Sequence, residues 1–168
     1  SPLGKTARQR TMSVTIRRAV LQDLPDIIAI EEASFSSPWS HQSLRAEFDN
    51  RVARYYVLEG EDGTVAAYAD LWLIADEGQL ANIAVHPSAR GLGYGETLLR
   101  TAMEAVFHDG CRSVFLEVRL SNAAAIALYE KLGYEKTAIR KGYYSQPVED
   151  AYIMNCTKEN YRWLRHLL

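Results

Sequence analysis

Three glycines at alternate positions are the clearest chemical signal in the sequence. They fall in the stretch RGLGYG, which consists of Arg90, Gly91, Leu92, Gly93, Tyr94 and Gly95. Apolar residues at 80–85 predict a strand before it, and apolar side chains at helical spacing predict a helix that begins at Gly95 or Glu96. Glycines keep side chains off the backbone, and the first N–H groups of a helix are unpaired and lie at the positive end of its dipole. The stretch therefore predicts a cradle for phosphate or pyrophosphate, with Arg90 as its charge partner.

The residues around these glycines narrow the class of phosphate ligand. A nucleoside-triphosphate loop is excluded, because no Gly-Lys-Ser or Gly-Lys-Thr follows them. The dinucleotide fingerprint fits poorly, because Glu96 occupies the position of its third glycine. Glu117 lies near the distance at which that fingerprint has a ribose-binding acid, but inside an apolar strand rather than at its end. Dinucleotide binding stays an alternative, which protection against unfolding by NAD and not by CoA would indicate.

The spacing Arg-x-x-Gly-x-Gly, between a strand and a helix, resembles the acyl-CoA pyrophosphate loop of the GCN5-related N-acetyltransferases. With LANIAVHP before the loop and FLEVRLSNAAAIALYEKLGY after it, the chain is similar to the RimI-type branch. That branch acetylates the N-terminal alanine of a bacterial ribosomal protein. The resemblance covers nearly the whole chain, from Val14 to Met154. It implies acetyl-CoA as cosubstrate, no metal, and direct attack by the acceptor amine in a ternary complex.

The order of the predicted elements agrees with this fold. Ser40, and either Ser121 or Asn122, can cap helices, as can Asp23. An antiparallel meander followed by strand, helix, strand and helix predicts an α/β (α+β) protein with a mixed, mostly antiparallel central sheet and helices on both faces. In the family that the chain resembles, a V-shaped gap between the two central parallel strands holds the pantetheine arm. Strands are predicted over residues 14–18, 55–59, 65–74, 80–85, 113–119, 134–144 and 150–156, and helices over 24–33, 40–50, 95–107 and 123–132.

Length and composition indicate one domain. With 168 residues, of which 48% are hydrophobic, the chain can form a good core over residues 12–157. Residues 1–11 are expected to be a disordered or non-native extension, and residues 158–168 a helical tail.

The net charge and the cysteines limit the classes of partner and the cellular location that the sequence allows. The formal charge of −2 argues against a nucleic-acid surface and suits a basic peptide or an amine as partner. Cys111 and Cys156 lack metal-type spacing, and no apolar run is long enough for a membrane span or a signal peptide. The expectation is a cytoplasmic monomer or weak dimer without direct nucleic-acid or membrane binding.

Acyl transfer from a thioester to an amine requires a base for the amine and a proton for the departing thiolate. In VFLEVR, Phe115, Glu117 and Arg119 share one face, so the Glu117 carboxylate projects from a half-buried strand. The resemblance implies that Glu117 is the base, acting through water, and that Tyr129 is the acid. The alternatives are an ion pair of Glu117 with Arg119 or another cation, and a packing role for Tyr129.

The resemblance also implies residues that bind the cosubstrate. Asn122 would hydrogen-bond the pantetheine arm or the phosphate region, and helix capping is its alternative role. The backbone of Ile83, Ala84 and Val85 would pair with the pantetheine amides as an added strand and help to bind the thioester oxygen. Tyr129 would contact the same arm, at the leaving sulfur.

Four aromatic residues are expected to wall the acceptor site, and they are Phe35, Trp39, Tyr143 and Tyr144. For Tyr143 and Tyr144 the resemblance carries this expectation, because in the family a Gly/Asn-Tyr-Tyr hairpin closes over the peptide N-terminus. Phe35 and Trp39 flank a break between two short helices, and a hydrophobic plug on the sheet explains them equally well. The loop departs from the family pattern at Tyr94, where a small aliphatic residue is usual, and at Glu96. Glu96 suits the helix dipole but would repel the phosphates of CoA if it pointed inward.

The sequence therefore leads to a functional hypothesis with two alternatives. The hypothesis is acetyl transfer from acetyl-CoA to a protein N-terminal α-amine, that of the N-terminal alanine of a bacterial small-subunit ribosomal protein. Within enzymes, the alternative acceptor is an internal lysine, a polyamine or another small amine. A non-catalytic CoA-binding module is the alternative from another class, and the presence of both Glu117 and Tyr129 argues against it.

Overall fold

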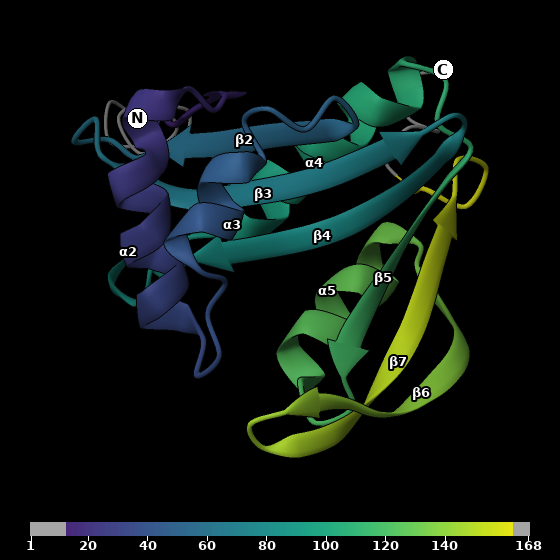
Figure 1. Cartoon of the computed structure of the whole chain (residues 1–168). Coiled ribbons are helices and arrows are strands. Elements are labelled where there is room, and N and C mark those ends of the chain that lie inside the picture. The colour runs from purple at the N-terminus through teal and green to yellow at the C-terminus, as the bar shows by residue number, and fades with distance from the viewer. Residues whose placement is uncertain (1–12, 163–168) are drawn as a thin grey trace, which may run out of the picture.

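A sheet of seven strands forms the centre of the molecule, which the computed structural model describes from residue 13 to residue 162 (Figure 1). The strand order is β1-β2-β3-β4-β5-β7-β6, and neighbouring strands run antiparallel except for the parallel pair β4 and β5. The predicted mixed, mostly antiparallel sheet is therefore confirmed. The strands are β1 (Thr15–Arg18), β2 (Ala53–Glu59), β3 (Val65–Ile74), β4 (Glu77–Val85), β5 (Ser113–Arg119), β6 (Glu135–Ser145) and β7 (Val148–Thr157).

Helices cover both faces of this sheet, as the sequence predicts. In Figure 1, α2 and α3 lie in front of β2, β3 and β4, and α4 lies behind them. Ile27 and Ile30 of α2 belong to one buried cluster, whereas Leu99 of α4 and Leu132 of α5 belong to a second, larger one. The helices are two short 3-10 turns, η1 (Leu21–Asp23) and η2 (Pro87–Ala89), followed by α2 (Leu24–Ser34), α3 (His41–Ala46), α4 (Tyr94–His108) and α5 (Ala123–Leu132).

The two parallel strands separate after a short contact. β4 pairs with β5 at Glu77, Gly78 and Gln79 and no further along the described ladder, and beyond that point the two ribbons diverge (Figure 1). The β3–β4 register shifts between Asp70 and Leu71, where Ala81 of β4 is the extra residue, and this irregularity lies just beyond the last β4–β5 pairing at Gln79. The predicted V-shaped gap between the central parallel strands is present.

Alternation along β5 fixes which side chains face that gap. Val114, Leu116 and Val118 are buried in the larger core cluster, whereas Glu117 is directed away from it. The sequence predicted this alternation and the bounds of β5, because a period of two with apolar residues on one face leaves little choice of register.

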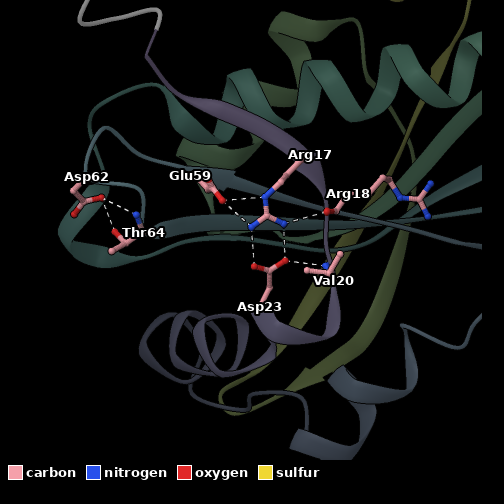
Figure 2. A network of polar contacts seen from close by, with 7 residues as sticks. All are labelled: Arg17, Arg18, Val20, Asp23, Glu59, Asp62 and Thr64. Atoms are coloured by element: carbon pink, nitrogen blue, oxygen red, sulfur yellow. Dashed lines mark hydrogen bonds and ion pairs between the residues drawn. The ribbon is translucent and has the colours of Figure 1, made fainter.

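The N-terminal strand is tied to the domain by a polar network (Figure 2). Arg17 donates to both oxygens of Asp23, at 2.8 and 2.9 Å, and to Glu59 Oε1 at 2.8 and 3.0 Å. The Asp23 carboxylate also accepts from the Val20 N–H at 2.8 Å. Asp23 is the N-cap residue of α2, as predicted, but its side chain makes no capping hydrogen bond, because Arg17 and Val20 take its oxygens. The hydrogen bonds from Arg17 are the main reason that the pKa of Asp23 lies below its ordinary value.

Several element ends differ from the sequence prediction. α3 ends at Ala46 rather than near Asn50, because the chain tightens into turns there and the Glu47 carboxylate binds the Trp72 indole N–H at 2.6 Å. β4 begins at Glu77, three residues early, since the turn before it is shorter than expected. The last hairpin turns at Gln146 and Pro147 instead of over residues 145–149.

The two chain ends are described only in part. Residues 158–162 form turns rather than the beginning of the predicted C-terminal helix. The rest of that predicted helix, like the extension predicted for residues 1–11, lies outside the described residues.

Candidate active site

A cavity of about 710 Å³ opens where β4 and β5 separate. Its walls come from α2 and the loop after it, from β4 and β5, from α5 with its cap, and from β6. The predicted site residues that line this one cavity are Phe35, Trp39, Ile83, Glu117, Asn122, Tyr129, Tyr143 and Tyr144. Residues separated by more than a hundred positions in the chain are thus brought to one space.

Glu117 faces this cavity from β5, with a side chain that is 10% exposed. Its Oε1 lies 3.3 Å from Nη1 of Arg140, which projects from β6 and is 56% exposed. The sequence analysis considered an ion pair with Arg119 or another cation, and Arg140 is the cation that the structure supplies. Arg119 pairs with Glu149 instead, at 3.3 Å. Because Arg140 is well solvated, this ion pair is a weak restraint on Glu117.

Tyr129 lines the cavity from α5 while its ring belongs to the larger core cluster. The ring packs against Tyr134, with centroids 5.5 Å apart. Burial raises the pKa of the Tyr129 phenol above its ordinary value of 10.0. A phenol in this position keeps its proton at neutral pH, so Tyr129 can donate a hydrogen bond into the cavity. The packing role weighed from the sequence is present together with access to the cavity.

Asn122 combines two of its expected properties. Its Oδ1 accepts from the Ala125 N–H at 3.2 Å, so the predicted cap of α5 is confirmed. The same residue lines the cavity beside Tyr129. Cap geometry therefore fixes the place of Asn122 at the cavity wall.

A buried acid that the sequence analysis did not single out supports the β4 wall. Glu31 of α2 accepts from Asn82 Nδ2 at 2.8 Å, from the Tyr68 hydroxyl, and from the Trp39 N–H at 2.9 Å. Asn82 Oδ1 in turn accepts from the Ile83 N–H at 3.0 Å. Glu31 and Asn82 both line the cavity. The available signal was a glutamate among the isoleucines of an apolar helix, where a charged side chain is out of place without buried partners.

The glycine loop lies at one end of the splayed strand and outside this cavity. Gly91 and Gly93 have positive φ angles of 82° and 78°, and Gly93 is the N-cap of α4. These are conformations that glycine adopts without strain, and the first N–H groups of α4 have no partner within the helix. Arg90 donates to the Val85 carbonyl at 3.4 Å. The loop fits a diphosphate group, and the unpaired part of β4 fits the amide-bearing arm of an acyl-CoA.

Tyr94 and Glu96, the two residues of this loop that depart from the family pattern, lie in different surroundings. Glu96 lies 2.7 Å from Lys131 of α5, so a cation accompanies its charge at the first turn of α4. Tyr94 and Leu92 line a second hollow of about 560 Å³, which they share with the β2–β3 turn. The other predicted cosubstrate-binding residues are not among the described residues that line the larger cavity. They are Ala84, Val85, Arg90, Gly91, Gly93 and Gly95.

The aromatic residues form two facing walls. Tyr143 and Tyr144 of β6 make an edge-to-face pair with centroids 4.9 Å apart, and burial raises the pKa of Tyr144 to about 12. Phe35, which belongs to the α2–α3 loop, lines the same cavity and is partly exposed. Trp39 also packs on the smaller core cluster, so the plug considered from the sequence describes Trp39 better than Phe35.

Known proteins share this architecture and much of this sequence. The model of the Acetyltransferase (GNAT) family matches residues 24–134. The [ribosomal protein bS18]-alanine N-acetyltransferase of Salmonella typhimurium (strain LT2) is 42% identical over 135 residues, which are 79% of this chain and 89% of that protein. The protein of the same name from Escherichia coli (strain K12) is 37% identical over 142 residues, 83% of this chain and 95% of that protein. The crystal structure of the ribosomal-protein-S18-alanine N-acetyltransferase from Escherichia coli has a TM-score of 0.80 at 36% identity, over 86% of this chain and 93% of that one.

A splayed parallel pair with a glycine loop at a helix N-terminus defines an acyl-CoA-dependent transferase fold. The chain belongs to the acetyltransferase (GNAT) family. Within residues 13–162, no group of three or more His, Cys, Asp or Glu side chains is placed to hold a metal ion. The same part of the chain contains no helix with the length and apolar character needed to cross a membrane.

Proposed function

We propose that this protein transfers an acetyl group from acetyl-CoA to the N-terminal α-amine of a protein, with the N-terminal alanine of a ribosomal protein as acceptor. The observation that carries the proposal is one cavity in which Glu117 and Tyr129 meet the free edge of β4. Relatives that are 37% and 42% identical over about four fifths of the chain bear the name of this reaction, which supports the choice of acceptor.

Glu117 acts as the base in this mechanism. A free α-amine has a pKa of roughly 7.7–8.0, so at neutral pH a modest base suffices to take its proton. The Glu117 carboxylate takes that proton through a water, and the neutral amine then attacks the thioester carbonyl. The aromatic walls formed by Tyr143, Tyr144 and Phe35 hold the acceptor chain so that the amine points toward Glu117.

Tyr129 acts as the acid at the other side of the carbonyl. A thiol has a pKa of roughly 8.5, so the departing sulfur needs only a hydrogen bond or a proton, which the protonated Tyr129 phenol provides. The backbone of residues 83–85 holds the acyl arm along β4, and the loop from Arg90 to Gly95 holds the diphosphate. Asn122 fixes the start of α5 and so the height of Tyr129 along the cavity.

The test uses purified protein, acetyl-CoA and two peptides of the same basic sequence, followed by intact-mass measurement. One peptide has a free N-terminal alanine and no lysine, and the other has a blocked N-terminus and a single lysine. The expected result is a gain of one acetyl group on the first peptide and none on the second. A gain on the second peptide alone would remove the α-amine acceptor, and no gain on either would remove protein acetylation as the function.

A further inference from the structure

Arg119 ends β5 two residues after Glu117, and its guanidinium holds the tip of the β6–β7 hairpin. Its Nη1 donates to the Pro147 carbonyl at 2.9 Å, and its Nη2 reaches the Gln146 carbonyl at 3.5 Å. The same Nη1 lies 3.3 Å from Oε1 of Glu149, which also accepts from Ser121. The Arg119 side chain is 25% exposed, so solvent screens these charge-assisted hydrogen bonds only in part.

The guanidinium also orders one acceptor wall. Its central carbon lies 4.3 Å from the centroid of the Tyr144 ring, a distance at which a cation and an aromatic face attract each other. Arg119 and Tyr144 both line the cavity. One side chain thus fixes the aromatic wall and the tip of the hairpin that carries it.

The opposite wall of the cavity reaches the same tip. Ser36 Oγ donates to the Gln146 carbonyl at 2.7 Å, and Ser37 Oγ lies 3.0 Å from Gln146 Oε1. Both serines belong to the loop after α2 and line the cavity. Four residues therefore join the α2–α3 loop to the β6–β7 hairpin, although these two walls lie more than a hundred residues apart in the chain. We call them the hairpin clasp, and they are Ser36, Ser37, Arg119 and Gln146.

We infer that Arg119 is a positioning residue for the acceptor, which acts by keeping the hairpin clasp closed and Tyr144 in place. The inference rests on the proposed function, since it assigns the two aromatic walls to the acceptor. The β4 edge and the glycine loop, which bind acetyl-CoA in that proposal, are built from other residues. Loss of Arg119 therefore raises the KM for the acceptor peptide and leaves the KM for acetyl-CoA unchanged.

The variant Arg119→Met keeps the length of the side chain and removes the guanidinium. Its matched control is Arg112→Met, because Arg112 is 82% exposed and its ion pair with Asp76 spans 3.8 Å. Charge-assisted hydrogen bonds of this kind predict a rise of about tenfold in acceptor KM for Arg119→Met, with acetyl-CoA KM within about twofold of wild type. Arg119→Lys, which retains the charge but not the planar fork, should recover part of the loss.

Amide hydrogen exchange gives a second measurement that needs no acceptor. In Arg119→Met, amides of residues 142–150 should exchange about tenfold faster than in wild type, and those of β2 and β3 should not change. If Arg119→Met does not fold, the double variant Ser36→Ala/Ser37→Ala removes the clasp from its other side, and about threefold faster exchange of the same amides is expected.

Unchanged exchange of these amides in a folded variant overturns the clasp. Faster exchange with an unchanged acceptor KM overturns the role of Arg119 in positioning the acceptor. Failure of the proposed function is a separate result, in which wild-type protein acetylates no N-terminal peptide.

Discussion

Asp70 on β3 is a buried carboxyl group beside the strand that lines the cavity. It is 1% exposed and is paired in register with Asn82 of β4. Neither of its oxygens accepts a hydrogen bond from a described residue, and its acidic neighbour is Glu47, which is also buried. Burial, and then the nearby Glu47 carboxylate, raise the pKa of Asp70 to about 9. Asp70 therefore holds a proton at neutral pH.

This proton makes the stability of the fold depend on pH. The folded pKa of about 9 lies above the ordinary value of 3.8, so the stabilisation is complete below pH 3.8 and is lost as pH rises toward 9. Across that window the unfolded chain binds one proton fewer than the folded one at this site. The free energy of unfolding should fall by about 1.4 kcal/mol for each pH unit on account of Asp70 alone.

The variant Asp70→Asn has nearly the same shape and no titrating group. Urea unfolding of both proteins, at about pH 5, 6, 7 and 8, gives the difference in unfolding free energy at each pH. From pH 5 to pH 8, the unfolding free energy of the wild type should fall by about 4 kcal/mol relative to that of the variant. The control is Asp76→Asn, which makes the same chemical change at a site that is about half exposed. A constant difference for Asp70→Asn would mean that Asp70 is ionised in the folded protein.

Four further substitutions address the base, the phosphate loop and the N-terminal anchor. Glu117→Gln should lower kcat/KM by about 10² to 10⁴, because an amide cannot take the proton, and wild-type turnover from about pH 6 to about pH 9 would remove Glu117 as base. Glu96→Gln should tighten CoA binding by about two- to fivefold and Lys131→Met should weaken it, because each changes the charge at the first turn of α4. Calorimetric titration measures both affinities, and unchanged affinity in both variants would mean that neither charge acts on the phosphates. Asp23→Asn should lower the free energy of unfolding by about 1–3 kcal/mol at pH 7, because Arg17 loses a charged partner. The pKa of Asp23 is lowered in the fold, so this loss should shrink as pH falls below 3.8 and disappear below the folded pKa. A loss that persists there would contradict the ion-pair explanation.

Local patterns in the sequence were sufficient to predict the elements that carry the candidate acid and base. The alternation in VFLEVR gave β5 its bounds and its buried face. Asn122 and Gly133 bracket α5 as predicted, and Gly133 adopts a φ of 111° with the Asn160 carbonyl packed against it. A side chain at Gly133 would meet that carbonyl, so the helix end is specified both by backbone conformation and by space.

Contacts between distant segments could not be read from those patterns. Glu117 meets Arg140 across 23 positions, Glu31 meets Asn82 across 51, and Ser36 meets Gln146 across 110. Helical or strand periodicity constrains only the nearest neighbours of a residue, so it says which face a glutamate occupies and not which cation it meets. The buried Glu31 was detectable as an anomaly in an apolar helix, but its three donors come from elements whose relative placement only the fold determines.

The cavity exists because the sheet ladder stops early, and this makes its shape depend on residues outside it. β4 and β5 share a ladder only from Glu77 to Gln79 among the described pairings, so further along the sheet hydrogen bonds do not set the distance between the two walls. The core shared by α4 and α5 packs behind the sheet, and the hairpin clasp ties the α2–α3 loop to the hairpin whose strand β7 pairs with β5. Substitutions in either place should alter acceptor binding while Glu117 and Tyr129 stay intact.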